Sequence, residues 1–351
     1  MGIKHLNKFL RNSCPHSIRP ISIADLSGKR IAVDISIYLY KYEAEGLLLE
    51  NMYLMLSIFR YYNVIPIFIF DGKAPAEKKE LLQKRREDRT EALKEFNDLK
   101  NQLKNADDDD RQEIIASMDQ LKKQIVTINR KKINRVKELI RAYGATYYDA
   151  PSEADELCSM LVLKKKVWAC MSEDMDMFVY GCVRVIRYFS LVNHTAILYY
   201  TKGIMEELEM THHEFRQVCI LSGTDYNLQT KEENSKVNLY TTMKYLRKYK
   251  TEIAKGKTQL RDFYEWLLAN EPKYVVDMEM LEKIYSMFDL TNNHENLKIF
   301  DEIKIINGPI IEYKMREIMQ EDGFVFPSDD EKSASIVSSD NEEKEIVDIS
   351  L

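Results

Sequence analysis

Residues 65–72 read Ile-Pro-Ile-Phe-Ile-Phe-Asp-Gly, an unbroken apolar run that ends in an acidic residue and a glycine. An apolar run of this length without polar alternation is typical of a strand that a parallel sheet buries on both faces. Residues 30–35, Arg-Ile-Ala-Val-Asp-Ile, repeat the pattern and bring Asp34 to the end of a second apolar run. The two segments therefore predict buried strands that carry Asp71 and Asp34 at their carboxyl ends.

Strands and helices alternate outward from these two segments. Short apolar runs predict further strands, and longer stretches with helical periodicity predict helices. The expected strands are residues 146–149, 167–171, 183–189 and 196–200, and the expected helices are residues 47–62, 76–104 and 111–142, one that opens at 152, and most of the chain from about 203 to about 320. Residues 1–22 read as a short helix and a loop. The alternation predicts an α/β fold with a mostly parallel central sheet.

The predicted organisation has three parts. A core of residues 1–225 includes a helical arch insertion at 76–142, a helical region of residues 226–327 follows, and residues 328–351 form a tail rich in serine and acidic residues. The tail holds eight acidic residues and two lysines, so it carries the whole formal net charge of −6. Its composition predicts disorder. The rest of the chain is neutral, and its function must be judged from where its charges lie.

The composition also excludes some classes of protein. Five cysteines (Cys14, Cys158, Cys170, Cys182 and Cys219) lie far apart, with no Cys-x-x-Cys pair. Such a set favours reduced thiols in an intracellular protein and disfavours a zinc site. No apolar run approaches the roughly 18 residues that a membrane span needs.

Acidic residues recur at the ends of the predicted strands and at the start of the helix after one of them. They are Asp34, Asp71, Glu153, Asp155, Asp174 and Asp176, with Asp225 as a further candidate. The carboxyl ends of parallel strands share one edge of a sheet, so these side chains are expected to converge. Converging carboxylates need cations to balance them, and an all-oxygen set suits Mg²⁺ or Mn²⁺. Two such ions can activate water and stabilise the leaving oxygen of a phosphodiester. For any one acid, a helix cap or turn is the alternative interpretation.

Basic residues dominate the helices predicted on either side of four aspartates at residues 107–110. Lys78 and Arg85 are seven residues apart and share a helix face, with Lys84 and Arg86 beside Arg85. Residues 121–137, which include Lys131 and Lys132, contain seven basic residues and no acid. Basic helices beside an acidic metal pocket favour a polyanion held with its phosphate over the metals. A pair of solvated helices is the alternative.

Together these segments resemble the flap endonuclease family, the XPG-type 5′-nucleases, over about residues 1–226. The motifs are MGI at the start, VDIS at 33–36, IFDGKAP at 69–75, DAPSEAD at 149–155, SEDMDMF at 172–178 and ILSGTDY at 220–226. The resemblance implies a PIN-like nuclease core with two Mg²⁺ ions, which Mn²⁺ could replace, held by Asp34, Asp71, Glu153, Asp155, Asp174, Asp176 and Asp225. It further implies that Lys78 and Arg85 contact the scissile phosphate beside the catalytic acids Asp71 and Asp174.

Contacts to nucleic acid are expected outside the metal site. By resemblance, Tyr40 stacks on the terminal base near the cut and Gly2 lies against DNA. The basic helices add Lys84, Arg86, Lys131, Lys132, Lys244 and Lys248 as expected DNA-binding residues. Core packing of Tyr40, solvation of Lys78 and a simple turn at Gly2 are the alternative interpretations.

The sequence departs from the family pattern in four places. Asp155 replaces the usual glutamate. Residues 236–239, Lys-Val-Asn-Leu, replace the glycine-containing hairpin expected in a C-terminal helix–hairpin–helix-like region, so duplex anchoring and a K⁺ site stay open. The segment between Tyr40 and Ile65 is short and keeps only Arg60 as a basic contact. Finally, the tail lacks a sliding-clamp motif, and residues 257–264, which have the spacing of one, read as a core-facing amphipathic helix.

The leading hypothesis is a monomeric, Mg²⁺-dependent, structure-specific 5′-nuclease that acts on DNA with a 5′ flap or free 5′ end in replication, repair or recombination. A 5′-3′ exoribonuclease or junction resolvase on the same fold and a non-catalytic DNA-binding scaffold are the alternatives. The resemblance implies a nuclear location, with a cytoplasmic site such as a viral replication site as the alternative.

Overall fold

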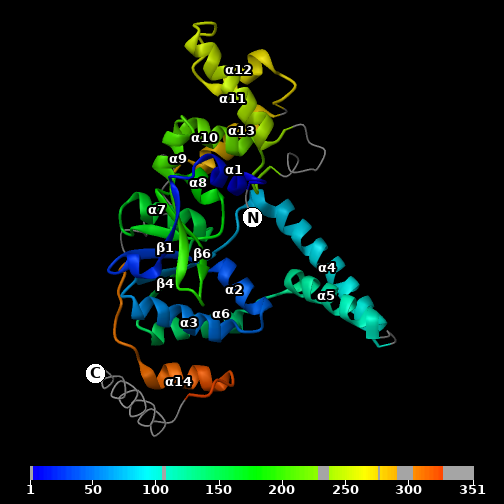
Figure 1. Ribbon diagram of the computed structural model, residues 1–351, viewed down its shortest axis with the longest axis vertical. Helices are drawn as coiled ribbons and strands as arrows, with labels where there is room; N and C mark the ends of the chain where they lie inside the picture. The colour runs from blue at the N-terminus through cyan, green and yellow to red at the C-terminus, as the bar shows by residue number, and fades with distance from the viewer. Residues whose placement is uncertain (1–2, 105–107, 228–236, 276, 291–302, 327–351) are drawn as a thin grey trace, which may run out of the picture.

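A seven-stranded sheet lies at the centre of the computed structural model, which describes residues 3–104, 108–227, 237–275, 277–290 and 303–326 (Figure 1). The strands are β1 (Ile18–Ser22), β2 (Arg30–Asp34), β3 (Ile65–Phe70), β4 (Thr146–Asp149), β5 (Ala169–Met171), β6 (Arg184–Ser190) and β7 (Thr195–Tyr200). Their spatial order is β1-β7-β6-β5-β2-β3-β4. Strands β2 to β6 run parallel, and β7 pairs antiparallel with β6 and β1. The predicted α/β fold with a mostly parallel sheet is confirmed.

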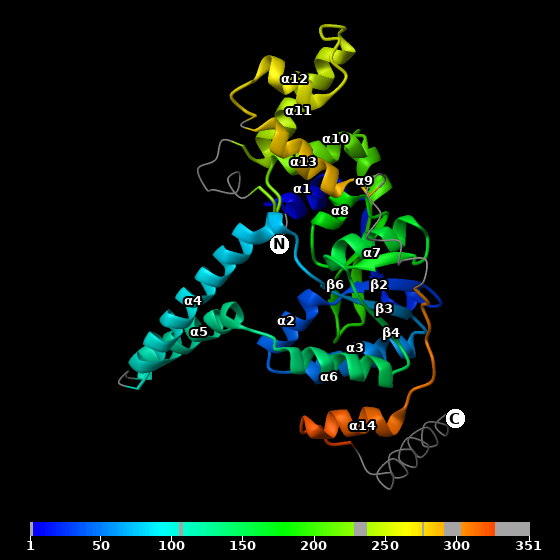
Figure 2. The same cartoon turned by 180° about the vertical axis from the view of Figure 1, so that it is seen from behind.

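Helices cover both faces of this sheet, as Figures 1 and 2 show. Successive residues of a strand point to opposite faces, so Ala32 and Ile67 pack into one hydrophobic cluster and Ile31 and Phe68 into the other. The first cluster joins the sheet to α1 (Leu6–Ser13), α7 (Ala154–Leu163), α8 (Asp176–Tyr180), α9 (Thr201–Glu207), α10 (His212–Leu221), α11 (Leu239–Ala254), α12 (Phe263–Asn270) and α13 (Met278–Phe288). The second joins it to α2 (Ser36–Ala44), α3 (Leu48–Tyr61), α6 (Arg130–Ala142) and α14 (Glu312–Glu321).

An arm of two packed helices projects from the core in both views (Figures 1 and 2). Its members are α4 (Lys79–Gln102), which follows the short 3₁₀ helix η2 (Ala76–Lys78), and α5 (Asp108–Ile125). The prediction of one helix over 111–142 is wrong, because three β-branched residues, Val126, Thr127 and Ile128, disfavour helix there. Asn129 then starts α6 by accepting the Lys132 backbone N–H at 2.9 Å. Only α4 and α5 form the α4–α5 arm, and α6 packs on α3 and α14 in the core.

The last part of the chain crosses from one end of the molecule to the other. Helices α11 and α12 lie at one end and α14 at the opposite end (Figures 1 and 2). Residues 303–311 carry no helix, although helices were expected to about 320. Arg60, expected as a basic DNA contact, instead donates to the Gly308 carbonyl at 2.7 Å and to the Tyr143 carbonyl. It therefore fastens the returning segment to the core.

Two further local expectations are corrected. The helix predicted over residues 257–264 begins only at Phe263, although Phe263 and Tyr264 are buried as expected. Residues 1–22 contain the strand β1 in addition to a helix. Pro20 obscured this strand in the sequence, but an edge strand tolerates proline because one side of it needs no partner.

The cysteines, the character of the helices and the chain termini bear on the remaining expectations. All five cysteines are buried free thiols. No helix in the described ranges combines the length and apolar character that crossing a membrane demands. Gly2, Asp107, the hairpin residue Lys236 and the acidic tail of residues 328–351 lie outside the described residues.

Candidate active site

Adjacent strands deliver carboxylates to one edge of the sheet. β5, β2 and β3 are neighbours, and their carboxyl ends lead into residues 172–176, Asp34 and Asp71. α7 begins beside them, with Glu153 at its N-cap and Asp155 in its first turn. Six of the seven predicted acids line one cavity: Asp34, Asp71, Glu153, Asp155, Asp174 and Asp225. Asp176 is buried next to this cavity, and its backbone N–H donates to Asp174 Oδ1 at 3.0 Å.

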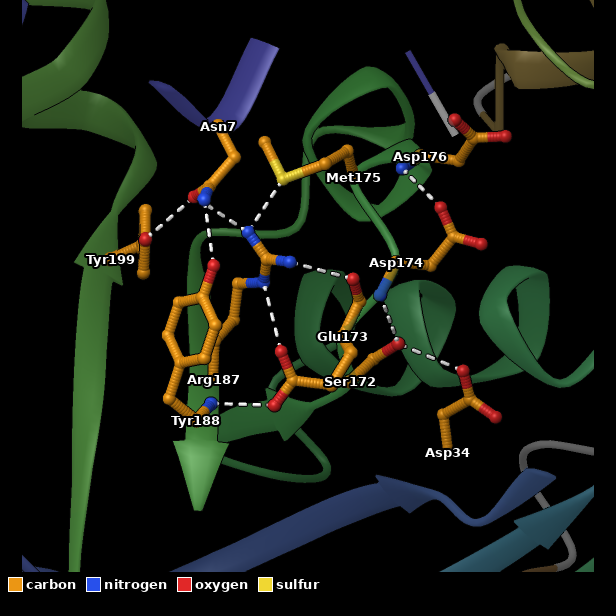
Figure 3. Close-up of polar contacts among 10 residues, drawn as sticks. All are labelled: Asn7, Asp34, Ser172, Glu173, Asp174, Met175, Asp176, Arg187, Tyr188 and Tyr199. Atoms are coloured by element: carbon orange, nitrogen blue, oxygen red, sulfur yellow. Dashed lines mark hydrogen bonds and ion pairs between the residues drawn. The ribbon is translucent and has the colours of Figure 1, made fainter. Parts of the chain in front are cut away.

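Two serine hydroxyls hold the central acids. Ser172 Oγ donates to Asp34 Oδ2 at 2.8 Å and accepts the Asp174 backbone N–H at 3.1 Å, so it links the ends of β2 and β5 (Figure 3). Ser36 Oγ donates to Asp71 Oδ2 and links the start of α2 to the end of β3. Ser36 and Ser172 belong to the same motifs as Asp34 and Asp174. Their hydroxyl groups therefore link the acids at the ends of the three strands.

A close backbone approach sets Asp71 against the start of α7. Asp71 Oδ1 accepts the Ala154 N–H at 2.9 Å, and the Gly72 N–H donates to the Ser152 carbonyl at 2.7 Å. A Cβ atom added to Gly72 would lie 1.9 Å from the Ala150 carbonyl oxygen. Only glycine permits this approach, which fixes Asp71 relative to Glu153 and Asp155.

Two cations neutralise the acids on the side of the α4–α5 arm. Lys78 is 8% exposed, and its Nζ lies 2.6 Å from Glu153 Oε2, which also accepts the Tyr226 hydroxyl at 2.7 Å. Arg85 Nη2 donates to Asp225 Oδ2 at 3.1 Å. The Arg85 side chain stays 42% exposed and Lys78 is buried, but both line the cavity and so both face a ligand held there.

Burial, and after it the repulsion among the acids, changes the ionisation of the site. Burial raises the pKa of Asp34 to about 7, with Asp71 and Asp174 adding repulsion. Burial and then the Glu153 carboxylate raise the pKa of Asp155 well above its ordinary value. Burial alone would lower the pKa of Lys78, but the carboxylates of Asp155 and Glu153 raise it above its ordinary value. The pocket thus favours added positive charge.

This donor set fits a hard divalent cation. All six cavity acids offer oxygen, the donor that Mg²⁺ and Mn²⁺ prefer. Among the residues that the structure describes, no three carboxylate, imidazole or thiol groups already stand in an arrangement that could hold a metal ion. Binding therefore requires side chains such as Glu153 and Asp225 to turn from their lysine and arginine partners toward the ion.

Without divalent cations, the protein is expected to lose stability as the pH rises from about 5 to about 8. Asp34 has a folded-state pKa of about 7 against an ordinary 3.8, so between these values the folded state holds more protons than the unfolded state. The free energy of unfolding then falls with rising pH across that window. Thermal unfolding in EDTA at several pH values measures this. Asp34→Asn should flatten the dependence, and a melting temperature that rises from pH 5 to pH 8 would contradict it.

Aromatic and basic residues complete the lining at the base of the α4–α5 arm. Tyr40 lines the cavity and is 48% exposed, so it is not a core residue. Arg86, one of the expected DNA-binding residues, lines the cavity as well. Arg89 from α4 and Lys123 from α5 join them. Lys123 belongs to the basic stretch that the sequence showed, but only the pairing of α4 with α5 reveals that it faces the acids.

The other predicted DNA-binding residues are not brought to this cavity. Lys84 and Lys131 are exposed on α4 and α6, and Lys132 on α6 pairs with Glu43 at the end of α2. Lys248 on α11 pairs with Glu271 at 3.1 Å, and Lys244 is exposed on the same helix. These residues lie on surfaces separate from the carboxylates.

Two family models match the chain, namely the XPG N-terminal domain over residues 1–92 and the XPG I-region over residues 144–225. Flap endonuclease 1 of Glossina morsitans morsitans is 31% identical over 247 residues, which cover 64% of this chain and 61% of that protein. Flap endonuclease 1 of Danio rerio is 30% identical over 244 residues, or 64% of this chain and 62% of that protein. The chain therefore spans about three fifths of the length of the curated relatives it matches.

Solved structures share the fold. The catalytic core of Rad2 in complex with a DNA substrate aligns with a TM-score of 0.60 at 20% identity, over 90% of this chain and 93% of that one. The Holliday junction-resolving enzyme GEN1, in complex with product DNA and a Mg²⁺ ion, aligns with a TM-score of 0.55 at 16% identity, over 91% of this chain and 72% of that one. These likenesses confirm the predicted PIN-like nuclease fold.

The matched regions coincide with the site. The N-terminal match contains Asp34, Asp71, Lys78 and Arg85, and the I-region match contains the acids from Glu153 to Asp225. Residues 93–143, which hold much of the α4–α5 arm, lie between the two matches. Both models match in the expected order and contain every predicted metal ligand, so the chain carries an XPG N-terminal domain and an XPG I-region and is similar to the flap endonucleases that it matches.

Proposed function

We propose that this protein is a divalent-cation-dependent, structure-specific 5′-nuclease that hydrolyses DNA phosphodiesters. The observation that carries the proposal is the cavity in which six carboxylates meet Lys78, Arg85 and Arg86 at the base of the α4–α5 arm. An acidic pocket suits metal ions, and basic residues on its rim suit a phosphate held above them. The relatives named flap endonuclease 1 point to a 5′ flap as the substrate.

Each side chain has a proposed role. Asp34, Asp71, Glu153, Asp155, Asp174, Asp176 and Asp225 hold two Mg²⁺ ions, which Mn²⁺ can replace. When bound, such ions supply the charge that activates water and stabilises the leaving 3′-oxygen. The products of this hydrolysis carry a 5′-phosphate and a 3′-hydroxyl. Lys78 and Arg85 turn from Glu153 and Asp225 toward the scissile phosphate and stabilise its developing negative charge.

The surface residues position the substrate. Tyr40 offers an exposed ring on which a terminal base can stack, a contact worth about 1–3 kcal/mol per base. The basic residues that contact phosphate are Lys84, Arg86, Lys131, Lys132, Lys244 and Lys248, and Gly2 lies close to DNA. Because Lys131 and Lys132 are on α6 and Lys244 and Lys248 are on α11, they meet parts of the substrate away from the cut. The protein acts as a monomer inside the cell, in the nucleus by analogy with its family.

A cleavage panel tests the proposal and its alternatives. Purified full-length protein is incubated with labelled 5′-flap, nicked, gapped and Holliday junction DNAs and with single-stranded RNA, in Mg²⁺, Mn²⁺ or EDTA. The expected result is cleavage of the flap with Mg²⁺ or Mn²⁺ and none with EDTA. Preference for the junction would favour a resolvase, as in the GEN1 neighbour, and preference for RNA an exoribonuclease. Absence of metal-dependent cleavage on every substrate would favour a non-catalytic scaffold.

A further inference from the structure

A buried arginine lies behind the loop that carries two of the acids. Arg187 on β6 is 5% exposed, and Figure 3 places its guanidinium beside Glu173 and Met175, on the side of residues 172–176 away from Asp34. Among the described residues that line the cavity, neither Arg187 nor Glu173 occurs. Arg187 therefore meets the loop from within the protein and does not contact a ligand in the cavity.

The guanidinium holds the loop at several points. Arg187 Nη2 donates to the Glu173 carbonyl oxygen at 2.7 Å, and Nη1 contacts Met175 Sδ at 2.7 Å. Its Nε lies 3.5 Å from Glu173 Oε2. The other carboxylate oxygen of Glu173, Oε1, accepts the Tyr188 backbone N–H at 2.5 Å. The backbone before Asp174 and the side chain after it are thus both attached to β6.

The arginine is itself fixed by its surroundings. The central carbon of its guanidinium, Cζ, lies 5.0 Å from the Tyr188 ring centre and 5.6 Å from that of Tyr199. Asn7 on α1 accepts hydrogen bonds from Arg187 Nη1 and the Tyr199 hydroxyl, both at 2.8 Å, and donates to the Tyr188 hydroxyl at 2.6 Å. A guanidinium held by two rings, an amide and a carboxylate cannot turn toward DNA.

On the cavity side of the loop, backbone hydrogen bonds attach the two acids. Asp174 is attached through its N–H to Ser172 Oγ, and Asp176 through its N–H to Asp174 Oδ1. Asp34, Asp155 and Asp174 line the same cavity as like charges, and their mutual repulsion favours movement apart. The contacts on the Arg187 side oppose that movement.

We propose that Arg187 is a positioning residue, which acts through Glu173 to hold Asp174 and Asp176 at the distance from Asp34 that metal binding needs. This inference rests on the proposed function, because it assigns these acids to the metal site. Groups behind the ligands of a metal typically change metal affinity or activity by 10–100-fold when they are lost. Arg187 is such a group, because it lies behind Asp174 on the side away from Asp34 (Figure 3).

The test compares Arg187→Gln with the wild-type protein in two measurements. Mn²⁺ binding without DNA is measured from the electron paramagnetic resonance signal of the free ion, and steady-state cleavage is measured on 5′-flap DNA. The expected result is an apparent Kd for Mn²⁺ raised about 10-fold or more and kcat lowered about 10–100-fold, with KM for DNA within about twofold. Arg187→Lys should recover part of both losses because it keeps the charge.

Arg184→Gln is the matched control. Arg184 lies on the same strand, and its guanidinium carbon lies 4.9 Å from the Trp168 ring centre. Its replacement should leave Mn²⁺ affinity and kcat unchanged. Equal losses in Arg184→Gln, or wild-type Mn²⁺ affinity and kcat in Arg187→Gln, would overturn the inference. If Arg187→Gln does not fold, Arg187→Lys and Glu173→Gln take its place. Their Mn²⁺ affinity and kcat are then compared with those of Arg184→Gln and of the wild-type protein.

A double-mutant cycle tests the route through Glu173. If Arg187 acts through that residue, Arg187→Gln combined with Glu173→Gln should be no worse than the more damaging single change. Losses that add would show that Arg187 acts separately and would refute the route. The proposed function would fail on a different result, namely absence of cleavage by the wild-type protein. In that case the Mn²⁺ titration would still measure the effect of Arg187, so the two failures can be told apart.

Discussion

Asp174→Asn is expected to lower the rate of flap cleavage at least about a thousandfold, a loss of roughly 4 kcal/mol of transition-state stabilisation, with DNA affinity nearly unchanged. The amide keeps the oxygen that accepts the Asp176 N–H at 3.0 Å, and the backbone N–H still reaches Ser172 Oγ, so the loop keeps its shape. What disappears is one negative charge at the end of β5. A neutral amide is a much weaker ligand for a hard divalent cation than a carboxylate.

The same substitution is expected to make the metal-free protein more stable. Asp174 is one of the charges that raise the pKa of Asp34 and of Asp155, so its removal relieves repulsion in a buried pocket. The expected gain in melting temperature in EDTA is about 2–4 °C, which corresponds to about 1 kcal/mol. A loss of activity that accompanies a gain of stability distinguishes a functional acid from a structural one.

Single-turnover cleavage, DNA binding in Ca²⁺ and thermal unfolding in EDTA together measure these effects. Asp149→Asn is the matched control, since Asp149 ends the parallel strand β4 but its exposed side chain pairs with Lys137 outside the cavity. The control should cleave like the wild-type protein. Full activity of Asp174→Asn, or an equal loss in Asp149→Asn, would exclude Asp174 from the site.

The sequence predicts the acidic half of the site well, because one rule of topology is sufficient. Parallel strands end at the same edge of a sheet, so the acids after three neighbouring strands must converge once the strands are recognised. The apolar runs that reveal those strands surround Asp34 and Asp71 directly. Asp225 was only a further candidate, because it comes from the helical region and the rule for strand ends does not place it; it lies just after α10 and lines the cavity.

Other parts of the site depend on contacts that no local pattern encodes. Arg187 meets Asn7 across 180 positions of sequence, and Arg85 meets Asp225 across 140. In the sequence, Arg187 is one of two arginines in the strand Arg184–Ser190, and an arginine in such a strand would be read as exposed. The break between α5 and α6 was missed for a different reason: the charged residues on both sides favour helix, and the signal at residues 126–129 is short.

Lys78→Met is expected to lower the cleavage rate about a hundredfold and to destabilise the metal-free protein by about 3 kcal/mol. Lys78 is 8% exposed and lies 2.6 Å from Glu153, so its loss leaves a buried carboxylate without its nearest positive charge. Methionine has a similar length and fills the space beside Tyr226, which separates the effect of charge from that of packing. Mg²⁺ should restore part of the lost stability, because an ion in the pocket replaces the missing charge.

The neighbour Lys79 provides the control, because Lys79→Met makes the same chemical change on an exposed side chain one residue further along. Thermal unfolding with EDTA and with Mg²⁺, followed by single-turnover cleavage at a temperature where both variants are folded, separates stability from chemistry. If Lys78 contributes only a structural charge, saturating Mg²⁺ should return the rate of Lys78→Met to the wild-type value. A rate that stays about a hundredfold low in the folded, metal-saturated variant places Lys78 at the phosphate, since the ion has then already replaced its charge among the acids.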